Sequence, residues 1–293
     1  VVTVTVATVN HSPSFAAGGD QTVLEDGGAQ AVPGWATQIS PGPANESGQQ
    51  VSFAVSSDDP ALFAEIPAVA PDGTLTYTTA PAANGVAHVT VVAQDDGGTA
   101  GGGSDRSSPQ SFTITVDSVN DAPSFAAGGD QAGLEDAGVQ AVPGWATQIS
   151  AGPADESGQT ISFLVSNDDP ALFSAGPAVS PDGMLTYTPA PDANGVAHVI
   201  VAARDDGGTA RGGSDTSAAQ SFTITVLPVN DAPSFVGGPD QTRLEDTGAQ
   251  AVAGWATQIS PGPANESGQH VAFNVQSDDP SLFSVQPTIA PDG

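Results

Sequence analysis

Short segments of the chain alternate apolar and polar residues. The clearest examples in the first part of the chain are VSFAV (51–55), TLTYT (74–78), AHVTVVA (87–93) and SFTITV (111–116). A period of two places every second side chain on one face, which is typical of half-buried β-strands and not of helices. The breaks between these segments carry turn residues such as Pro71-Asp72-Gly73, where glycine supplies positive φ and aspartate can bond its own backbone. The pattern therefore predicts an all-β protein.

The same pattern recurs along the chain. The segment GWATQIS occurs three times, with its tryptophan at Trp35, Trp145 and Trp255, so the repeat is 110 residues long. A repeat of this length is large enough to hold its own core, unlike the short repeats of solenoids. We therefore expect tandem immunoglobulin/cadherin-like Greek-key β-sandwich domains, arranged as beads on a string, with about seven short strands in each.

Domain boundaries follow from the repeat. Residues 10–119 and 120–229 are predicted to be two complete repeats, and residues 1–9, VVTVTVATV, match the last strand of a preceding repeat. Residues 230–293 match a truncated third repeat that lacks the counterparts of MLTYT, AHVIVAAR and QSFTITV. The third repeat is therefore not expected to close its own sandwich, and the chain resembles a window cut from a longer array.

Aromatic side chains occupy equivalent places in each repeat. In the first two repeats these are Trp35, Phe53, Phe63, Tyr77 and Phe112, and Trp145, Phe163, Phe173, Tyr187 and Phe222. A tryptophan inside an apolar segment is usually buried, so these residues are predicted to form the cores. A sugar-binding aromatic platform is the alternative for the tryptophans.

Composition excludes several functions. The 293 residues carry a net charge of -29 and include no cysteine, and the cations are four arginines with no lysine. Such a surface repels nucleic acid and anionic membranes, and it cannot hold a disulfide or a thiolate zinc site. No apolar run approaches the ~20 residues of a membrane span, so membrane insertion is not expected in this segment. Because the acids recur at fixed places, a divalent cation is expected to offset them.

Three motifs resemble the cadherin-like extender domains of large bacterial surface adhesins of the RTX type. The segment VIVAARDDGGTARGGSDTSAAQSFTITVLPVNDAPSF is similar to the end of a cadherin repeat, in which A-x-D-x-G leads through the last strand to D-x-N-D-N-x-P-x-F. VNDAPSF occurs at 119–125 and 229–235, and LED occurs at 24–26, 134–136 and 244–246. The resemblance implies calcium ions bound where one domain meets the next.

The resemblance also implies which residues bind calcium. The junction between the first and second repeats would use Glu25, Asp26, Asn120, Asp121, Asp155, Glu156, Asp205 and Asp206. The next junction would use Glu135, Asp136, Asn230, Asp231, Asn265 and Glu266, and the entrance to the first repeat would use Asn10, Asp95 and Asp96. Acidic loops suit Ca²⁺ independently of the resemblance, because this ion takes six to eight oxygen ligands in irregular geometry.

The chain departs from the family pattern in ways that reduce the expected number of ions. Ser118 and Pro228 replace the first acid of D-x-N-D-N. PAAN (81–84) or PDAN (191–194) replaces the upstream L-D-R-E and removes its glutamate, and His11 stands where the other repeats have aspartate. An alternative interpretation is that Asn120-Asp121 only caps a turn before proline and that the LED acids are solvated. Asp58-Asp59-Pro60 is interpreted as a turn.

Catalysis is not expected. The acids recur in every repeat and lie in turn signals, whereas a glycosidase needs one acid pair in a cleft. The histidines do not cluster in the sequence, so strand or surface positions are expected for them in place of a zinc site.

The sequence therefore predicts a non-enzymatic, extracellular stalk segment, at a cell surface or secreted, whose partners are calcium ions and neighbouring repeats. Two alternatives stay open: a subunit of a self-assembling filament, in which identical chains are partners, and a repeated weak ligand- or carbohydrate-binding module.

Overall fold

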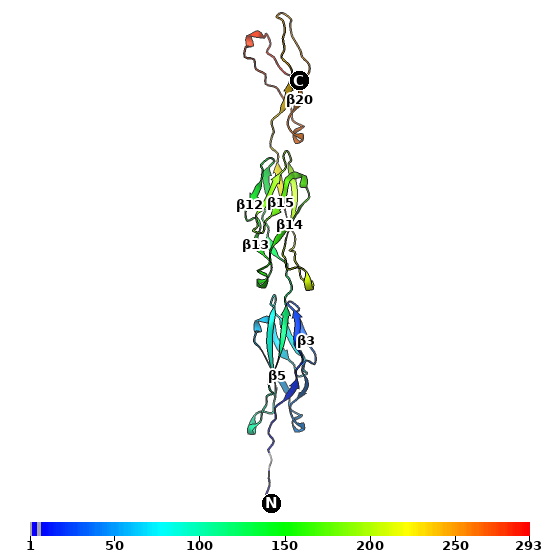
Figure 1. Ribbon diagram of the computed structural model, residues 1–293, viewed down its shortest axis with the longest axis vertical. Helices are drawn as coiled ribbons and strands as arrows, with labels where there is room; N and C mark the ends of the chain where they lie inside the picture. Colours follow the sequence, from blue (N-terminus) through cyan, green and yellow to red (C-terminus); the bar gives the residue numbers. More distant parts are fainter. Residues whose placement is uncertain (1, 5–6) are drawn as a thin grey trace. The chain divides into compact units, whose positions relative to one another are not determined.

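The computed structural model describes residues 2–4 and 7–293, and the chain divides into two compact units. The first unit comprises the chain up to Asp121 together with the loop Thr209–Gly213. The second comprises Ala122–Gly208 and Ser214–Gly293. Each unit is built from β-strands and short 3-10 helices, as Figure 1 shows.

The first unit follows the alternation of the sequence. Its strands are β1 (Ser14–Ala16), β2 (Gln21–Leu24), β3 (Ala29–Val32), β4 (Thr37–Ser40), β5 (Val51–Ser57), β6 (Phe63–Val69), β7 (Leu75–Thr79), β8 (Gly85–Asp95) and β9 (Gln110–Asp117). The 3-10 helices are η1 (Ala44–Glu46), η2 (Pro60–Leu62) and η3 (Ala100–Gly102), and η6 (Ala210–Gly212) lies in the loop that joins this unit.

Two sheets face one another across the core of this unit. One has the order β2-β9-β8-β5, the other has the order β3-β7-β6, and β1 pairs with β4 beside them. Most neighbours are antiparallel, but β2 runs parallel to β9, with Leu24 opposite Asp117. The ends of β2 and β9 therefore lie at the same edge of the sheet.

The second unit repeats this topology. Its strands are β10 (Ser124–Ala126), β11 (Gln131–Leu134), β12 (Gln140–Val142), β13 (Thr147–Ser150), β14 (Ser162–Asn167), β15 (Phe173–Val179), β16 (Leu185–Pro189), β17 (Gly195–Arg204) and β18 (Gln220–Leu227), with η4 (Ala154–Glu156) and η5 (Pro170–Leu172). The sheet orders are β11-β18-β17-β14 and β12-β16-β15, and β10 pairs with β13. β11 is again parallel to β18, with Leu134 opposite Leu227.

Each sandwich has one apolar core made of the inward side chains of these strands. In the first, Leu75, Val89, Val91 and Ile114 are completely buried, and their counterparts are completely buried in the second. The aromatic residues predicted to form the cores pack around them: the ring centroid of Trp35 lies 4.5 Å from that of Phe112. Trp35 and Trp145 therefore belong to the cores and do not form a sugar-binding platform.

The second unit also contains the third repeat, which is open. It includes β19 (Ser234–Gly237), β20 (Ala256–Ser260), η7 (Ala264–Glu266) and η8 (Pro280–Leu282). Phe235 is 49% exposed, whereas its counterpart Phe15 is 7% exposed. The ring of Phe235 packs against that of Phe273, with centroids 5.0 Å apart, as Phe15 packs against Phe53 in the first repeat.

The predicted fold class is confirmed: the protein consists of tandem all-β sandwiches. The predicted strand over residues 1–9 lies partly outside the described residues, and residues 2–4 and 7–9 form no strand. A strand needs a hydrogen-bonded neighbour, and none of the described residues pairs with this segment. Of the helices that the described residues form, none has the length and apolar character needed to cross a bilayer.

Candidate metal centre

The LED motif lies at the linker because of the parallel strand pair. Glu135 directly follows β11, and its backbone N–H donates to the carbonyl oxygen of Leu227, the last residue of β18, at 2.9 Å. The chain leaves β18 at the same edge and continues as the linker 228–233. Residues that follow β11 and residues that follow β18 are therefore neighbours, although they lie far apart in the sequence.

Glu135 is the most deeply buried acid of this region, with 1% of its surface exposed. Its carboxylate accepts hydrogen bonds from the backbone of Val229 at 2.7 Å and from Asn194 Nδ2 at 3.3 Å. Asn265 Nδ2 of the third repeat donates to the same carboxylate at 3.2 Å. Within the part of the chain that the structure describes, Glu135 forms no ion pair. Because buried charges are normally paired or bind metals, a cation is expected nearby.

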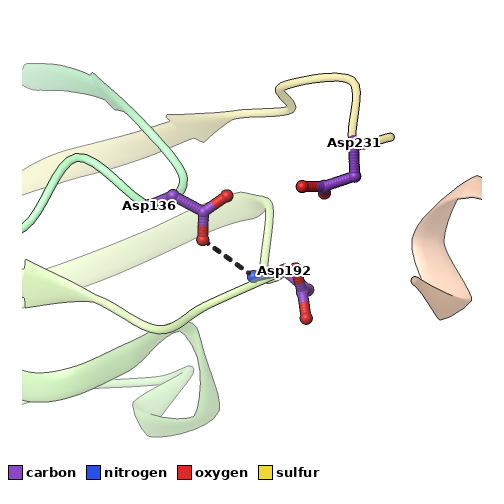
Figure 2. Close-up of side chains that lie close together, drawn as sticks. All are labelled: Asp136, Asp192 and Asp231. Atoms are coloured by element: carbon purple, nitrogen blue, oxygen red, sulfur yellow. Dashed lines mark hydrogen bonds between the residues drawn. The ribbon is translucent and has the colours of Figure 1, made fainter. Parts of the chain in front are cut away.

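Three aspartates gather beside this glutamate. Ligand oxygens of Asp136, Asp192 and Asp231 all lie within 4.8 Å of one another. Figure 2 shows that they come from three separate loops and that the carboxylates of Asp136 and Asp231 point toward each other. The backbone N–H of Asp192 donates to Asp136 Oδ1 at 3.3 Å, which joins two of the loops. Carboxylates at this spacing repel one another unless a cation lies between them.

Glu266 approaches the same region from the third repeat. This side chain is 5% exposed, and its Oε1 accepts a hydrogen bond from the backbone of Asp231 at 2.8 Å. Glu266 Oε2 and Asp231 Oδ2 are buried, and neither accepts a hydrogen bond from any described residue. Buried polar atoms normally have partners, so these two oxygens are suited to a further ligand.

The chemistry of the donors fits a hard cation. The cluster offers carboxylate oxygens and amide side chains, and it contains neither histidine nor cysteine. Oxygen-only sites of irregular geometry favour Ca²⁺ and, with more water, Mg²⁺, whereas zinc sites prefer nitrogen and sulfur. The residues present therefore fit calcium.

The electrostatics of the cluster change the ionisation of Asp231. Partial burial is the largest cause that raises the pKa of Asp231 above its ordinary value of 3.8, and the negative charges of Asp136, Asp192, Glu266 and Glu135 raise it further. A raised pKa means that the charged form is disfavoured in the folded state. A bound cation would remove this penalty.

A first prediction follows for Asp231→Asn. A raised folded-state pKa contributes stability that is present below pH 3.8 and is lost as the pH rises through the raised pKa. In calcium-depleted buffer, the Asn variant should therefore melt at a higher temperature than the wild type at pH 7, and the difference should vanish below pH 3.8. With millimolar calcium at pH 7 the order should reverse. Thermal melting at several pH values tests this, and a calcium-free variant that melts lower at pH 7 would contradict it.

The first unit has the same arrangement at the end of its sandwich. Glu25 is 4% exposed and accepts hydrogen bonds from the backbone of Val119 and from Asn84 Nδ2. Asp26 Oδ1 accepts from the backbone of Ala82 at 3.2 Å. Both acids of this LED motif therefore lie beside the linker, but the position that holds Asp192 in the second repeat holds Ala82 here.

The entrance to the first repeat contains a further network. Asn10 Nδ2 donates to Asp95 Oδ1 at 2.8 Å, and Gln49 Nε2 donates to Asn10 Oδ1 at 2.8 Å. Asp95 is 4% exposed, and its Oδ2 accepts no hydrogen bond from a described residue. Asp96 is exposed and accepts from the backbone of Gln50 at 3.0 Å. Asn10 and Asp95 are therefore brought together, while Asp96 joins its loop to the segment that precedes β5.

The entrance to the second repeat has the corresponding acids. Glu156 and Asp205 are buried, and Asp205 Oδ1 accepts from the backbone of Gly207 at 3.0 Å. Asp206 Oδ1 accepts from the backbone of Thr160 at 2.8 Å, and Asp155 lies in η4. Asn120 and Asp121 belong to the first unit. Binding of one ion by acids of both units therefore stays a prediction.

Asn230 and Asp192 lie beside the linker in ways that the sequence did not predict. Asn230 Nδ2 donates to the backbone oxygen of Asp231 at 2.9 Å, so this side chain is turned onto the linker. Asp192 was missed by the sequence analysis, although PDAN keeps the aspartate of the family's L-D-R-E at its second position.

The histidines occupy ordinary structural positions. His88 Nδ1 lies 2.9 Å from Asp58 Oδ2, and the His88 backbone donates to Asp58 Oδ1 at 2.7 Å. This backbone hydrogen bond is the main reason that the pKa of Asp58 lies below its ordinary value. His198 and Asp168 repeat the pair. Asp58-Asp59-Pro60 is therefore a turn that closes β5 against β8, as predicted.

Comparisons with known proteins leave the family of this chain open. The chain matches no known protein family and no protein of curated function. Among solved structures it resembles human protocadherin-24 EC1-2, form II, at 15% identity and a TM-score of 0.46, over 74% of this chain and 100% of that chain. Mouse protocadherin-24 EC1-3 is 16% identical with a TM-score of 0.41, over 73% and 70% of the two chains. Drosophila N-cadherin EC1-4 is 15% identical with a TM-score of 0.27, over 78% and 54%. At this level of similarity, function has to be inferred from the side chains of this chain.

Proposed function

We propose that the chain is a non-catalytic extender segment of an extracellular surface protein and that calcium stiffens the junctions between its repeats. The observation that carries this proposal is the convergence of acids from both sides of one linker. Glu135, Asp136 and Asp192 come from the second repeat, Asp231 comes from the linker, and Glu266 comes from the third repeat.

Calcium at this point would act as a crosslink. Its ligands would be the oxygens of Asp136, Asp192 and Asp231, with Glu135 and Glu266 close by. With the ion bound, carboxylates from two repeats and from the linker between them would coordinate the same cation. Without it, the like charges repel and the proline-containing linker permits movement. Stiffness of the junction would therefore follow the calcium concentration.

The expected affinity suits an extracellular protein. Extracellular calcium modules have dissociation constants of about 10⁻⁴ to 10⁻³ M, which match millimolar calcium outside cells. The resemblance to bacterial adhesin extenders supports a stalk that holds a binding or anchoring module away from a cell surface. The strong negative charge and the absence of lysine are consistent with this setting.

Calcium titration of the whole chain tests the proposal. We expect calorimetric binding with a dissociation constant of about 10⁻⁴ to 10⁻³ M. At a calcium concentration about 100 times the dissociation constant, each site should stabilise the fold by about 2.7 kcal/mol. Small-angle X-ray scattering should show a longer, stiffer particle in calcium than in chelator.

Controls separate specific binding from general screening of charge. Magnesium at the same concentration screens charge equally and should not reproduce the stiffening, because it demands octahedral geometry and keeps its water. Asp168→Asn removes one exposed charge that pairs with His198 and does not belong to the acidic cluster, so it should leave binding unchanged. Equal effects of calcium and magnesium, or no calorimetric signal, would refute the proposal.

A further inference from the structure

The outer face of the four-stranded sheet in the second repeat is apolar. Successive side chains of a strand point to opposite faces, and on this face Leu164 of β14 is 48% exposed and Ile200 of β17 is 50% exposed. Leu164 lies opposite Ala202, so Leu164 and Ile200 are diagonal neighbours on paired strands. We call Leu164, Ile200 and Ala202 the apolar patch. The face continues with three further exposed side chains, Leu134, Val196 and Leu227.

The apolar patch is particular to the second repeat. The equivalent residues of the first repeat are Ala54, Thr90 and Val92, and the third repeat has Asn274 at the position of Leu164. The first and second repeats nevertheless pair these strands in the same register. Because the same sheet forms with smaller and more polar residues, the fold does not require Leu164 and Ile200. Exposed apolar side chains that the fold does not need are suited to a contact with another surface.

The charge of the chain favours this face for contact between two copies. With a net charge of -29, most surfaces of two chains repel each other. The strands β14, β17 and β18, however, contain no acidic residue. Asp130 lies beside β18 on the side of β11, where its Oδ1 accepts a hydrogen bond from the backbone of Thr223 at 2.7 Å. The apolar patch on β14 and β17 is therefore a place where two copies can approach with little repulsion.

Opposite charges lie at the two ends of the apolar patch. Arg204 is opposite Ser162 at one end, and Asp168 follows β14 at the other, where it pairs with His198. At about 3.3 Å per residue, these ends are about 20 Å apart. Arg204 is 53% exposed and Asp168 is 57% exposed. Arg204 donates to Asp215 through Nε and Nη2, which leaves the N–H groups of Nη1 for a second acid.

We propose that this face binds the same face of a second copy of the chain, with the strands antiparallel and the two copies related by a two-fold axis. In such an isologous contact, the apolar patches face each other and Arg204 of each copy meets Asp168 of the other, so the ion pair forms twice. Stalk segments would then associate side by side. None of these residues belongs to the acidic cluster, so the proposal does not rest on the calcium function.

Sedimentation equilibrium of the whole chain tests the proposal. The apolar patch is small, so we expect a weak dimer, and the concentration should range from about 1 µM to about 1 mM. A salt concentration of about 0.15 M is suitable, because its Debye length of about 8 Å screens the net charge but not ion pairs in contact. The wild type should change from monomer to dimer within this range.

The double variant Leu164→Ala, Ile200→Thr tests the apolar patch. It copies Ala54 and Thr90 of the first repeat, which form the same strands, so folding is not threatened. The association constant should fall at least about tenfold, as expected for residues at the centre of an interface. The matched control is Val139→Ala, which copies Ala29. Val139 is 74% exposed and precedes β12 of the other sheet, so this control should leave the association constant unchanged.

A double-mutant cycle tests the antiparallel orientation. Arg204→Gln, which copies Gln94, and Asp168→Asn should each lower the association constant by about threefold, because surface ion pairs are weak. The combined variant should be no weaker than either single variant, because both changes remove the same pair. Additive effects of the two changes would overturn the pairing of Arg204 with Asp168 and with it the antiparallel arrangement.

Two other results would overturn the proposal. A chain that stays monomeric at every concentration would leave this face to a partner of different chemistry. A dimer that persists unchanged in the Leu164→Ala, Ile200→Thr variant would place the contact on another surface, such as the open third repeat with its exposed Phe235.

Discussion

Trp145→Ala is expected to reduce the free energy of unfolding of the second repeat by about 3–5 kcal/mol, the usual loss for removing a large core aromatic. Trp145 is 3% exposed, and its ring centroid lies 4.5 Å from that of Phe222. Its Nε1–H donates to the carbonyl oxygen of Gly129 at 3.2 Å, so the substitution also leaves a backbone acceptor without its donor. Urea denaturation followed by circular dichroism measures the loss.

The repeats supply matched controls for this experiment. Trp35→Ala should affect the first repeat by a similar amount, because Trp35 has the same burial and the same bond to Gly19. Trp255→Ala should have a much smaller effect, because Trp255 is only partly buried in the open third repeat. If domains behave as beads, Trp145→Ala should leave the transition of the first repeat unchanged. A loss below about 1 kcal/mol for Trp145→Ala would contradict the core assignment.

Glu135→Gln is expected to weaken calcium binding at the junction after the second repeat by at least about tenfold, since affinity of such sites depends on the number of ligand charges. Glu135 accepts bonds from the Val229 backbone and from two asparagines, Asn194 and Asn265. A glutamine amide would place a donor among these donors, so the carboxylate is needed for charge and for hydrogen bonding alike. Calorimetric titration of the whole chain, compared with Asp168→Asn, measures the change.

Unchanged calcium affinity of Glu135→Gln would mean that this residue is not a calcium ligand. If Glu135→Gln bound calcium as tightly as the wild type, Glu135 would serve only to anchor the linker through Val229. The calcium ligands would then be limited to the aspartates, and Asp192→Ala should abolish binding at this junction. That variant copies Ala82 of the first repeat, so its backbone conformation is compatible with the turn.

Much of the fold could be predicted from the residues. The alternating segments 51–55 and 87–93 became parts of β5 and β8, and strands one period of 110 residues apart form sheets of the same order. Strands such as β1 and β2 were not predicted, because three or four residues are too few for a clear period of two. They are recognised as strands only because another strand lies beside them.

The candidate site was predicted in part. Glu135, Asp136, Asp231 and Glu266 were named from the motifs, and the structure brings them together at the linker. Asp192 was missed because a single aspartate in a turn sequence has an ordinary explanation as a turn residue.

Alternation, repetition and charge depend on residues that are neighbours along the chain or lie one period apart, so the amino-acid sequence was sufficient to predict an all-β, acidic, tandem-repeat protein. The meeting of Glu135 with Val229 depends instead on β11 lying parallel to β18. Strand direction within a sheet is set by how the whole sandwich packs, because parallel and antiparallel ladders differ in hydrogen-bond pattern but both pair the backbone and both suit the same alternation. The tertiary structure was therefore needed to show which acids share one edge and which oxygens there are left without a donor.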